Sequence, residues 1–337
     1  MKKAILLLFF ALGFFSLLTQ TLIVREFIVS FGGNELGIGL FYFFWLFWVG
    51  IGSFLVFSFL GAIFDKHFLK LLFLYPILAF IEIALFISLK GIANVSWWEF
   101  FSLEKVFLYL FLFTSFISLF TGIIFTLGLL WLKRHVDSHA SKIVSISYVA
   151  ESLGSFFSGS IVTLLIAQLI APLIILVWAS LLFSVCAAIA SIRFKEKVSA
   201  IFNFLLFIFF LILTFNPQGL ITLGQNLRIK NLLPGATLVS EAYTPYQHIV
   251  LTKLPSQIVV LSDGQITSSL PEVIDADSQS ALFLCEADNS QADILIFGYG
   301  AENLINSLLK FPVRHITYCL EDKVYFKIIK ENLSSKQ

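Results

Sequence analysis

About seven stretches of the chain are long and apolar enough to cross a lipid bilayer as helices, and no other sequence feature constrains the fold as strongly. A helix needs about 20 mainly apolar residues to span the hydrocarbon core. The first stretch follows Lys2 and Lys3 and continues to Val24 without a small-residue cleavage site, so we expect an uncleaved helix. The other predicted spans cover residues 37–62, 68–90, 105–132, 144–168, 171–192 and 199–216. The sequence thus predicts an α-helical transmembrane bundle over residues 1–216.

Composition supports a lipid bilayer as the main partner of this region. The chain is 58% hydrophobic with a mean hydropathy of +0.94, whereas soluble domains are about 45–50% apolar. Its 40 phenylalanines exceed what one aqueous core needs and suit lipid-facing helices. The net charge is only +1, and neither part of the chain has the basic field that nucleic-acid binding requires. We therefore expect no nucleic-acid partner.

The cysteines give no sign of a metal centre or a disulfide framework. Cys186, Cys285 and Cys319 are far apart, and none belongs to a CxxC motif or a Cys/His cluster with the spacing of metal ligands. We expect three small buried residues and no bound metal.

Basic residues between the spans predict the orientation in the membrane. Ten of them fall on the side of the N-terminus and three on the other. Because basic loops stay in the cytoplasm, the N-terminus should be cytoplasmic in a bacterial-type inner membrane. Seven crossings would place the C-terminal part on the opposite side. That conclusion depends on the last span, whose continuous apolar core is only about sixteen residues long.

Four charged residues fall within or beside the predicted spans: Arg25, Glu26, Glu82 and Glu151. A charge near the bilayer centre is costly, about 2.5–3.5 kcal/mol on insertion scales, so Glu82 and Glu151 should face the interior of the bundle or be protonated. Two interpretations remain open. The carboxylates form a site or path for a polyamine, or they are paired or hydrogen-bonded between helices.

The composition changes after Asn216, where Pro217, Gly219, Pro234 and Gly235 indicate a linker over residues 217–240. Residues 241–337 should form a small α/β domain. Strand-like runs at 247–252 and 258–261 lead to a hairpin turn at Asp263-Gly264. A polar stretch over 267–280 should become helical. Runs at 293–297 and 313–319, with a helix over 303–310 between them, form a βαβ unit, whose strands hold nucleotides at their carboxyl ends.

The order of these motifs resembles the spermidine synthase (polyamine aminopropyltransferase) family, especially its membrane-embedded bacterial members. In the tail, the resemblance rests on Tyr243 to Ile249, on Asp263 to Ile266, on Ser269 to Glu272, on Ile294 to Gly300 and on Ile316 to Asp322. In the membrane part, it rests on Arg25-Glu26 with Gly33 to Glu35, on Gly50 to Ser53, and on Tyr148 to Gly154. The family's soluble fold is a β-hairpin region followed by a Rossmann-like domain, and the tail resembles that hairpin region and the first βαβ unit.

The resemblance implies transfer of an aminopropyl group from decarboxylated S-adenosylmethionine to an amine such as putrescine, which would yield spermidine. Gln247, Gly298, Gly300 and Glu321 would then bind this co-substrate, while Asp263 and Glu302 would bind the amine. The family's proton-accepting aspartate lies beyond the next strand, so no catalytic base is assigned here.

The sequence departs from the family pattern at the glycine turn and at the ribose-binding acid. Ala301 replaces the substrate-binding aspartate, Tyr299 replaces a glycine, and Leu320 occupies the position of the acid. A second hypothesis therefore stays open: a membrane protein that transports or senses a polyamine or similar cation, with a non-catalytic tail.

Overall fold

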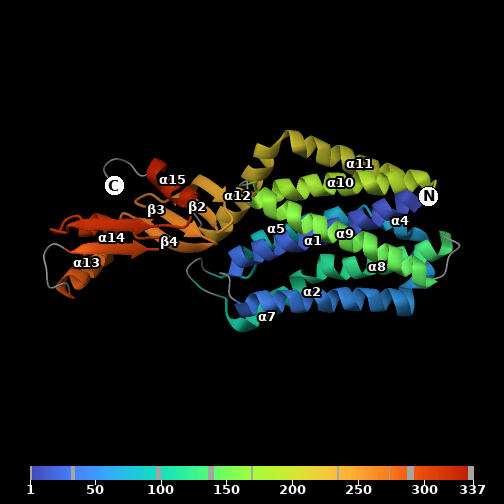
Figure 1. Cartoon of the computed structure of the whole chain (residues 1–337), viewed down its shortest axis with the longest axis horizontal. Coiled ribbons are helices and arrows are strands. Elements are labelled where there is room, and N and C mark those ends of the chain that lie inside the picture. Colours follow the sequence, from blue (N-terminus) through green and yellow to red (C-terminus); the bar gives the residue numbers. More distant parts are fainter. Residues whose placement is uncertain are drawn as a thin grey trace. The chain divides into compact units, whose positions relative to one another are not determined.

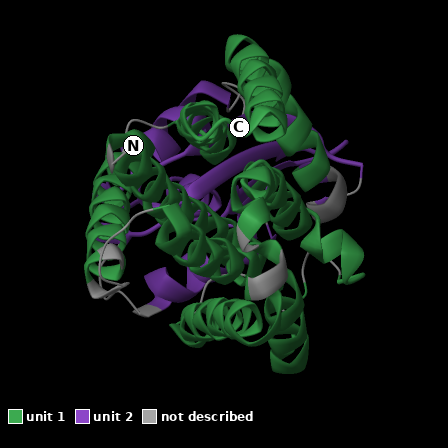
Figure 2. Ribbon diagram, turned by 90° about the vertical axis from the view of Figure 1, so that its right-hand side faces the viewer, with its two compact units in different colours: residues 1–95, 99–228 green, residues 96–98, 229–337 purple. Residues whose placement is uncertain are grey.

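In a computed structural model, the chain divides into two compact units: residues 1–95 and 99–228, and residues 96–98 and 229–337 (Figure 2). The structure describes residues 2–31, 35–95, 99, 101–135, 140–167, 170–233, 235–272, 274–286 and 292–332. Each unit is described by itself.

The first unit is a bundle of helices (Figure 1). Its long helices are α1 (Lys2–Phe31), α2 (Glu35–Leu55), α5 (Leu74–Ile87), α7 (Leu103–Phe113), α8 (Ser115–His135), α9 (Ala140–Ala167), α10 (Pro172–Arg193) and α11 (Lys197–Phe215). Shorter turns, η1 (Val56–Leu60), α3 (Gly61–Phe64), η2 (Asp65–His67), α4 (Phe68–Leu71) and α6 (Leu89–Ile92), join them. Helix α12 (Pro217–Leu232) follows α11.

Seven helical segments are long and apolar enough to span a membrane, within the part of the chain that the structure describes. They are Lys3–Phe31, Glu35–Leu60, Phe68–Ile87, Leu103–His135, Val144–Ile166, Pro172–Arg193 and Lys197–Phe215. The predicted spans are confirmed to within a few residues at most ends, including the last one. The protein is a multi-pass membrane protein.

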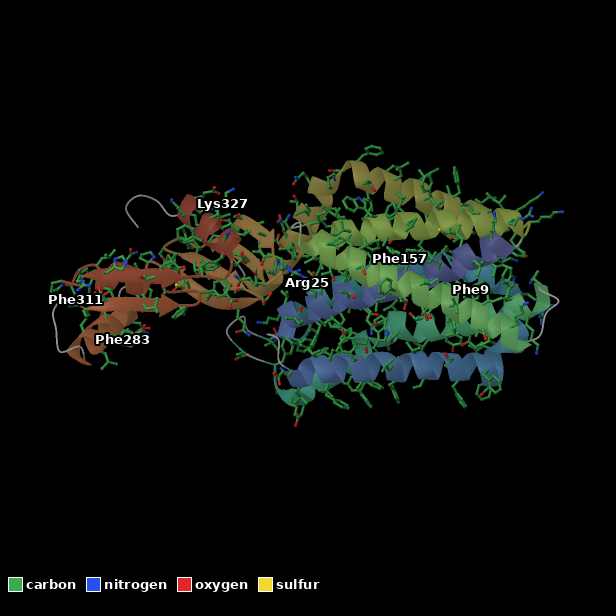
Figure 3. The ribbon with its side chains drawn as sticks, viewed as in Figure 1. Phe9, Arg25, Phe157, Phe283, Phe311 and Lys327 are labelled. Atoms are coloured by element: carbon green, nitrogen blue, oxygen red, sulfur yellow. The ribbon has the colours of Figure 1, made fainter. Side chains whose placement is uncertain are left out.

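Aromatic side chains fill the interior of the bundle and also cover its outside. Phe15 is fully buried and packs on Tyr75 and Phe183, with ring centroids 5.0 and 5.1 Å away. Phe9 is likewise buried, whereas Phe157 on α9 is 48% exposed (Figure 3). An apolar outer surface is what a lipid environment requires, because the hydrocarbon offers no partner to polar groups.

Two helix pairs cross at glycines where any side chain would overlap the backbone of the opposite helix. A Cβ at Gly13 would lie 2.0 Å from the Glu151 carbonyl oxygen, and a Cβ at Gly154 would lie 2.0 Å from that of Phe10. Gly52 of α2 and Gly122 of α8 meet the opposite backbone in the same way. Small residues allow helices to approach closely in membranes. The close α1–α9 crossing fixes the position of Glu151.

Two parts of the sequence-based outline differ from the structure. Helix α1 does not end near Val24: it continues to Phe31, so Arg25 and Glu26 are part of the helix. The expected linker over 217–240 contains helix α12 and the start of a strand. Pro217 begins α12, and a proline is tolerated there because the first helical N–H has no intrahelical partner.

The second unit contains two sheets (Figure 1). Strands β1 (Thr237–Tyr243), β2 (His248–Lys253), β3 (Ile258–Ser262) and β4 (Gln265–Leu270) form an antiparallel sheet in that order. Strands β5 (Asp293–Phe297) and β6 (His315–Cys319) pair in parallel. The helices are α13 (Ile274–Glu286), α14 (Glu302–Leu308) and α15 (Lys323–Asn332). Residues 267–280 are strand up to Leu270, so the predicted helix begins later than expected.

This unit confirms the predicted hairpin and the βαβ connection. Asp263 and Gly264 form the β3–β4 turn, both with positive φ, and α14 connects β5 to β6. Its main apolar core packs Ile249, Leu251 and Val260 of the sheet against Tyr325 and Ile329 of α15.

Replacing Gly154 by alanine should destabilise the bundle, because the new methyl group overlaps the Phe10 carbonyl of α1. Overpacking of this kind costs about 1–3 kcal/mol. Gly50→Ala is the matched control, since nothing lies within 4 Å of a Cβ at Gly50. Thermal unfolding of the purified full chain should show a lower midpoint for Gly154→Ala and an unchanged or higher midpoint for Gly50→Ala. Equal midpoints would contradict the close crossing.

Candidate functional site

A cavity of about 230 Å³ lies inside the helical bundle and combines a carboxylate, hydroxyl groups and aromatic rings. Five helices contribute to it: α1, α2, α5, α8 and α9. The lining residues are Leu12, Ser16, Val49, Ser53, Tyr75, Thr121, Gly122, Ile124, Phe125, Tyr148 and Glu151. Pockets for drug-sized ligands are about 300–1,000 Å³, so this one suits a smaller ligand or one end of a longer ligand.

Glu151 is the only carboxylate among the residues that line this cavity. It is half-buried on α9, and among the described residues no basic side chain forms an ion pair with it. A carboxylate without a cationic partner in an apolar bundle is unfavourable unless a ligand or a proton neutralises it. The cavity therefore contains one carboxylate without an ion-pair partner among the described residues.

The polar groups around Glu151 are held in fixed orientations by hydrogen bonds. The Thr121 hydroxyl donates to the Ile117 carbonyl at 2.7 Å, so the Tyr75 hydroxyl is the donor in its 2.7 Å contact with Thr121. Ser53 donates to the Gly122 carbonyl at 3.4 Å. These bonds leave lone pairs of the hydroxyl oxygens available as acceptors.

Aromatic rings complete the cavity wall. Tyr75 is 1% exposed, and Phe125 packs edge-on against Tyr148 at a centroid distance of 5.1 Å. Ring faces attract ammonium groups, and a carboxylate with hydroxyl acceptors satisfies their N–H donors. This combination is chemically suited to an organic amine cation.

Glu82 lies outside the cavity lining, on the same helix as Tyr75. It is fully buried, and its Oε2 accepts a hydrogen bond of 2.8 Å from the Ile117 N–H, in the first turn of α8. Its Oε1 has no hydrogen-bond partner among the residues that the structure describes. The prediction that Glu82 faces the bundle interior is confirmed.

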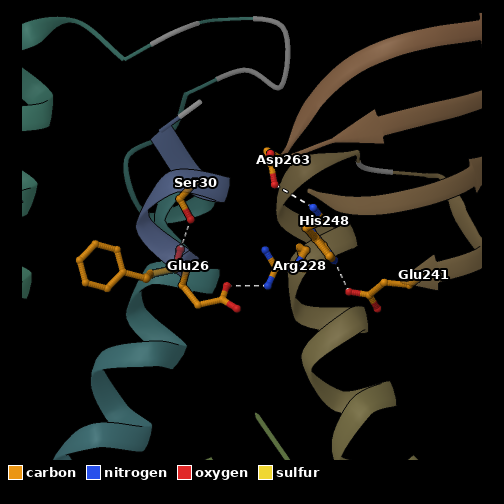
Figure 4. A network of polar contacts seen from close by, with 7 residues as sticks. Glu26, Ser30, Arg228, Glu241, His248 and Asp263 are labelled. Carbon is orange, nitrogen blue, oxygen red and sulfur yellow. Dashed lines mark hydrogen bonds and ion pairs between the residues drawn. The ribbon is translucent and has the colours of Figure 1, made fainter. Parts of the chain in front are cut away.

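Glu26 forms a buried ion pair between α1 and α12 (Figure 4). Its Oε2 lies 2.6 Å from Nη2 of Arg228, and the two side chains are 1% and 4% exposed. Arg25, its neighbour in sequence, is half-buried. One turn beyond Glu26, Ser30 donates to the Phe86 carbonyl at 2.7 Å. For Glu26 the structure therefore bears out interhelical pairing, with Arg228 and not Arg25 as the partner.

In the second unit, Gln247 and Asp322 form a buried polar link between the two sheets. One oxygen of Asp322 accepts hydrogen bonds from the Thr244 hydroxyl at 2.7 Å and from the Gln247 amide at 3.3 Å. The other accepts the Val324 N–H at 2.9 Å, which caps α15. Gln247 also accepts a hydrogen bond from the Ser262 hydroxyl. Both side chains are already engaged within the unit.

Two predicted site residues lie elsewhere. Asp263 has φ +48° in the β3–β4 turn, and its carboxylate accepts the His248 N–H at 2.8 Å (Figure 4). It closes the turn, as the turn-forming interpretation expects. Glu321 is exposed, and the next residue, Asp322, is the buried acid after β6.

The glycine turn after β5 is tightly packed. Gly298 and Gly300 have φ of +103° and +83°, and a Cβ at Gly300 would lie 2.3 Å from the Thr267 carbonyl. The Gly300 N–H donates to the Tyr325 hydroxyl at 3.2 Å. The Tyr299 ring packs edge-on against that of Tyr325, with centroids 5.0 Å apart.

Glu302 begins α14 and is 9% exposed beside two tyrosines. Tyr318 donates to its Oε1 at 3.5 Å. Burial, together with the charge of Glu302, raises the pKa of both Tyr318 and Tyr325, so these phenols stay protonated and act as donors. Oε2 of Glu302 has no hydrogen-bond partner among the described residues.

A second cavity, of about 500 Å³, lies in this unit but includes none of the predicted site residues. Its wall is mostly apolar and contains Phe283 and Leu284 of α13, residues 292–297, and Leu304 and Leu308 of α14. Gln247, Asp263, Glu302 and Glu321 therefore do not converge on this cavity.

Sequence reasoning found Glu151 but missed the groups that surround it. Ser16, Ser53, Tyr75 and Thr121 are ordinary residues of apolar spans. Only the helix packing brings them to one place. Asp322 was visible as an acid after the second strand of the βαβ unit, but its pairing with Gln247 depends on how the sheets meet.

The Glu26–Arg228 pair offers a test of the packing between α1 and α12. Removing one partner leaves a buried charge, which costs about 3–5 kcal/mol. Glu26→Leu and Arg228→Leu should each lower the unfolding midpoint of the purified chain strongly. The double variant should recover most of that loss, because it leaves neither charge unpaired. A double variant as unstable as the sum of the single variants would contradict the pairing.

Comparisons with models of protein families, with curated proteins and with solved structures find no match. The resemblance to the spermidine synthase family therefore rests on the motifs of the sequence itself, and the function must be argued from the site.

Proposed function

We propose that the transmembrane bundle binds an organic amine cation of the polyamine type and serves its transport or sensing. The observation that carries this proposal is Glu151, a carboxylate without a cationic partner among the described residues, in a cavity lined by hydroxyls and aromatic rings. The ammonium group of the ligand would pair with Glu151. Its remaining N–H groups would donate to the hydroxyl oxygens of Ser16 and Thr121.

The chemistry of the cavity favours an amine over other ligands. An anion would be repelled by Glu151, and no basic side chain lines the cavity to attract one. A divalent metal ion would need more charged ligands than a single carboxylate. An ammonium ion needs few charged partners, since it is also stabilised by the rings of Tyr75, Phe125 and Tyr148.

The second unit is then a non-catalytic module. Its candidate residues support this role: Gln247 and Asp322 are bound to each other, and Asp263 closes a turn. The Gly300 N–H, which could contact a bound nucleoside, donates to Tyr325 instead.

Aminopropyl transfer is the second candidate, and Glu302 is the observation that favours it. Its buried Oε2, without a hydrogen-bond partner in the described residues, lies at the glycine turn where the resemblance expects the amine site. The amine nitrogen would attack the propyl carbon of decarboxylated S-adenosylmethionine. The carbon–sulfur bond breaks, a neutral thioether leaves, and a base takes the amine proton. The second unit would then be part of a Rossmann-like domain.

The basic residues between the spans predict a bacterial-type inner membrane with a cytoplasmic N-terminus. Seven crossings would place the second unit outside the cytoplasm, away from S-adenosyl compounds. This expected membrane topology favours cation binding over aminopropyl transfer.

Calorimetric titration of the purified full chain with spermidine tests the amine site. We expect saturable binding, and we expect Glu151→Gln to weaken it about 10- to 100-fold, as for loss of a charged hydrogen bond of about 1.5–3 kcal/mol. Glu104→Gln is the matched control, because Glu104 is an exposed carboxylate at the start of α7. Equal affinities for the wild type and Glu151→Gln would refute the assignment.

A parallel titration with decarboxylated S-adenosylmethionine separates the two candidates. The amine-binding proposal expects no binding of this compound by the second unit. Saturable binding that Glu302→Gln weakens and Glu151→Gln leaves unchanged would instead favour aminopropyl transfer.

A further inference from the structure

A groove of about 750 Å³ lies on the outside of the bundle between α1 and α9. Its α9 wall runs from Ser145 to Leu153, and its α1 wall is one helix face made of Lys3, Leu6, Leu7 and Phe10. The apolar side chains of both walls include exposed ones, such as Leu6 at 40% and Val149 at 60%. Such a surface faces the hydrocarbon of the bilayer, so the occupant of the groove is itself a membrane component.

Helices α1 and α9 run in the same direction along the groove. The Ser155 hydroxyl donates to the Gly13 carbonyl at 3.2 Å. Four residues later on both helices, a Cβ at Gly159 would lie 3.5 Å from Leu17. The groove lies on the N-terminal side of these contacts, and the N-terminal ends of both helices therefore lie at the same end of the groove.

The two ends of the groove differ in chemistry. At the inner end, the ring of Phe10 lies 6.0 Å from that of Phe157, and the backbones of α1 and α9 meet at Phe10 and Gly154. Lys3 and Ser145, the first lining residues of their helices, lie at the outer end and are the polar ones among the described residues that line the groove. The groove is thus apolar inside and polar at its mouth.

The length of the groove suits an acyl chain within one leaflet. The rise from Lys3 to Phe10 is about 10 Å and that from Ser145 to Leu153 about 12 Å, at about 1.5 Å per residue. The hydrocarbon core is about 30 Å thick, so one leaflet contributes about 15 Å. A transmembrane helix of a partner protein would cross the whole core and extend far beyond this groove. A lipid of the leaflet at the N-terminal ends of α1 and α9 would not.

Positive charge gathers at the mouth of the groove. Lys3 is exposed there. Lys142 is also exposed and precedes Ser145 by three residues, so it lies on the same face of α9, one turn further out. No carboxylate is among the described residues that line the groove, and Glu151 of α9 lines the internal cavity instead. Lysines near the ends of membrane helices extend their ammonium groups to the level of the lipid headgroups.

We propose that this groove binds an acidic phospholipid of the surrounding bilayer, with an acyl chain between α1 and α9 and the headgroup phosphate at Lys3 and Lys142. Basic residues at the mouth of a pocket between membrane helices are suited to anionic headgroups. A zwitterionic lipid would bring its own cationic group close to both lysines and bind less tightly. The inference does not depend on the amine site, because Glu151 and the hydroxyls of the cavity take no part in it.

Native mass spectrometry of the purified full chain, titrated with dioleoyl phosphatidylglycerol or dioleoyl phosphatidylcholine, tests the headgroup assignment. The first phosphatidylglycerol should bind the wild type about 10- to 30-fold more tightly than phosphatidylcholine. Lys3→Gln and Lys142→Gln should each weaken phosphatidylglycerol about fivefold and leave phosphatidylcholine unchanged. Lys105→Gln is the matched control, since Lys105 is an exposed lysine at the start of α7, outside the groove. Equal affinities of the wild type for both lipids, or lysine variants that bind like Lys105→Gln, would overturn the proposal.

Filling the groove tests the position of the acyl chain in the same measurement. Val149→Trp should weaken binding of both lipids at this site, and the exposed position allows the chain to fold as before. Ile161→Trp is the matched control, because Ile161 is 40% exposed on the same helix but does not line the groove. Equal lipid binding by the two variants would overturn the proposal. So would a dimer of the wild type that Val149→Trp abolishes, because a second copy of the chain would then occupy the groove.

Discussion

The apolar surroundings of the bundle force each buried polar group to find a partner, and the structure around the carboxylates follows from this constraint. Water is absent from the hydrocarbon, so an unsatisfied charge is far more costly there than at an aqueous surface. Three glutamates meet the constraint in three ways. Glu26 pairs with Arg228, Glu82 binds a free N–H of a broken helix, and Glu151 faces a polar cavity.

The three arrangements differ in how far each carboxylate is already satisfied within the protein. The Glu26 pair is closed, since both charges are buried and neutralise each other. Glu82 accepts the N–H of a helix end with one oxygen, and its other oxygen is buried without a hydrogen-bond partner among the described residues. Glu151 lies in a cavity with room for a ligand, beside acceptors and ring faces that suit an ammonium group. The close approach of α1 and α9 at Gly13 and Gly154 holds it there.

Much of the fold could be predicted from the sequence because hydropathy alone identifies helices in a membrane. The seven spans, the Asp263-Gly264 turn and the βαβ connection were all visible as local patterns. Other features depend on tertiary contacts. Helix α1 passes Arg25 and Glu26 because Arg228, more than 200 residues later, neutralises Glu26. The region 217–240 looked like a linker because prolines and glycines mark both breaks and helix starts.

The candidate site could be predicted only in part, for the same reason. A glutamate inside an apolar span, such as Glu151, can be singled out from the sequence, because a charge there is costly unless it is neutralised. Apart from Tyr148, its hydroxyl and aromatic neighbours come from other helices, and no local pattern connects them. In the second unit, Gln247 was identified as a ligand-binding residue from its motif, but its amide is engaged by Asp322. The family resemblance and aminopropyl transfer remain predictions from the motifs.

Photoaffinity labelling with a diazirine-bearing polyamine, mapped by mass spectrometry on the full chain in lipid nanodiscs, tests the central claim most directly. The account predicts labels on peptides that contain Tyr75, Thr121 or Tyr148, reduced by excess spermidine. Labels confined to the segment from Asp293 to Lys310, or labels that excess spermidine does not reduce, would contradict it.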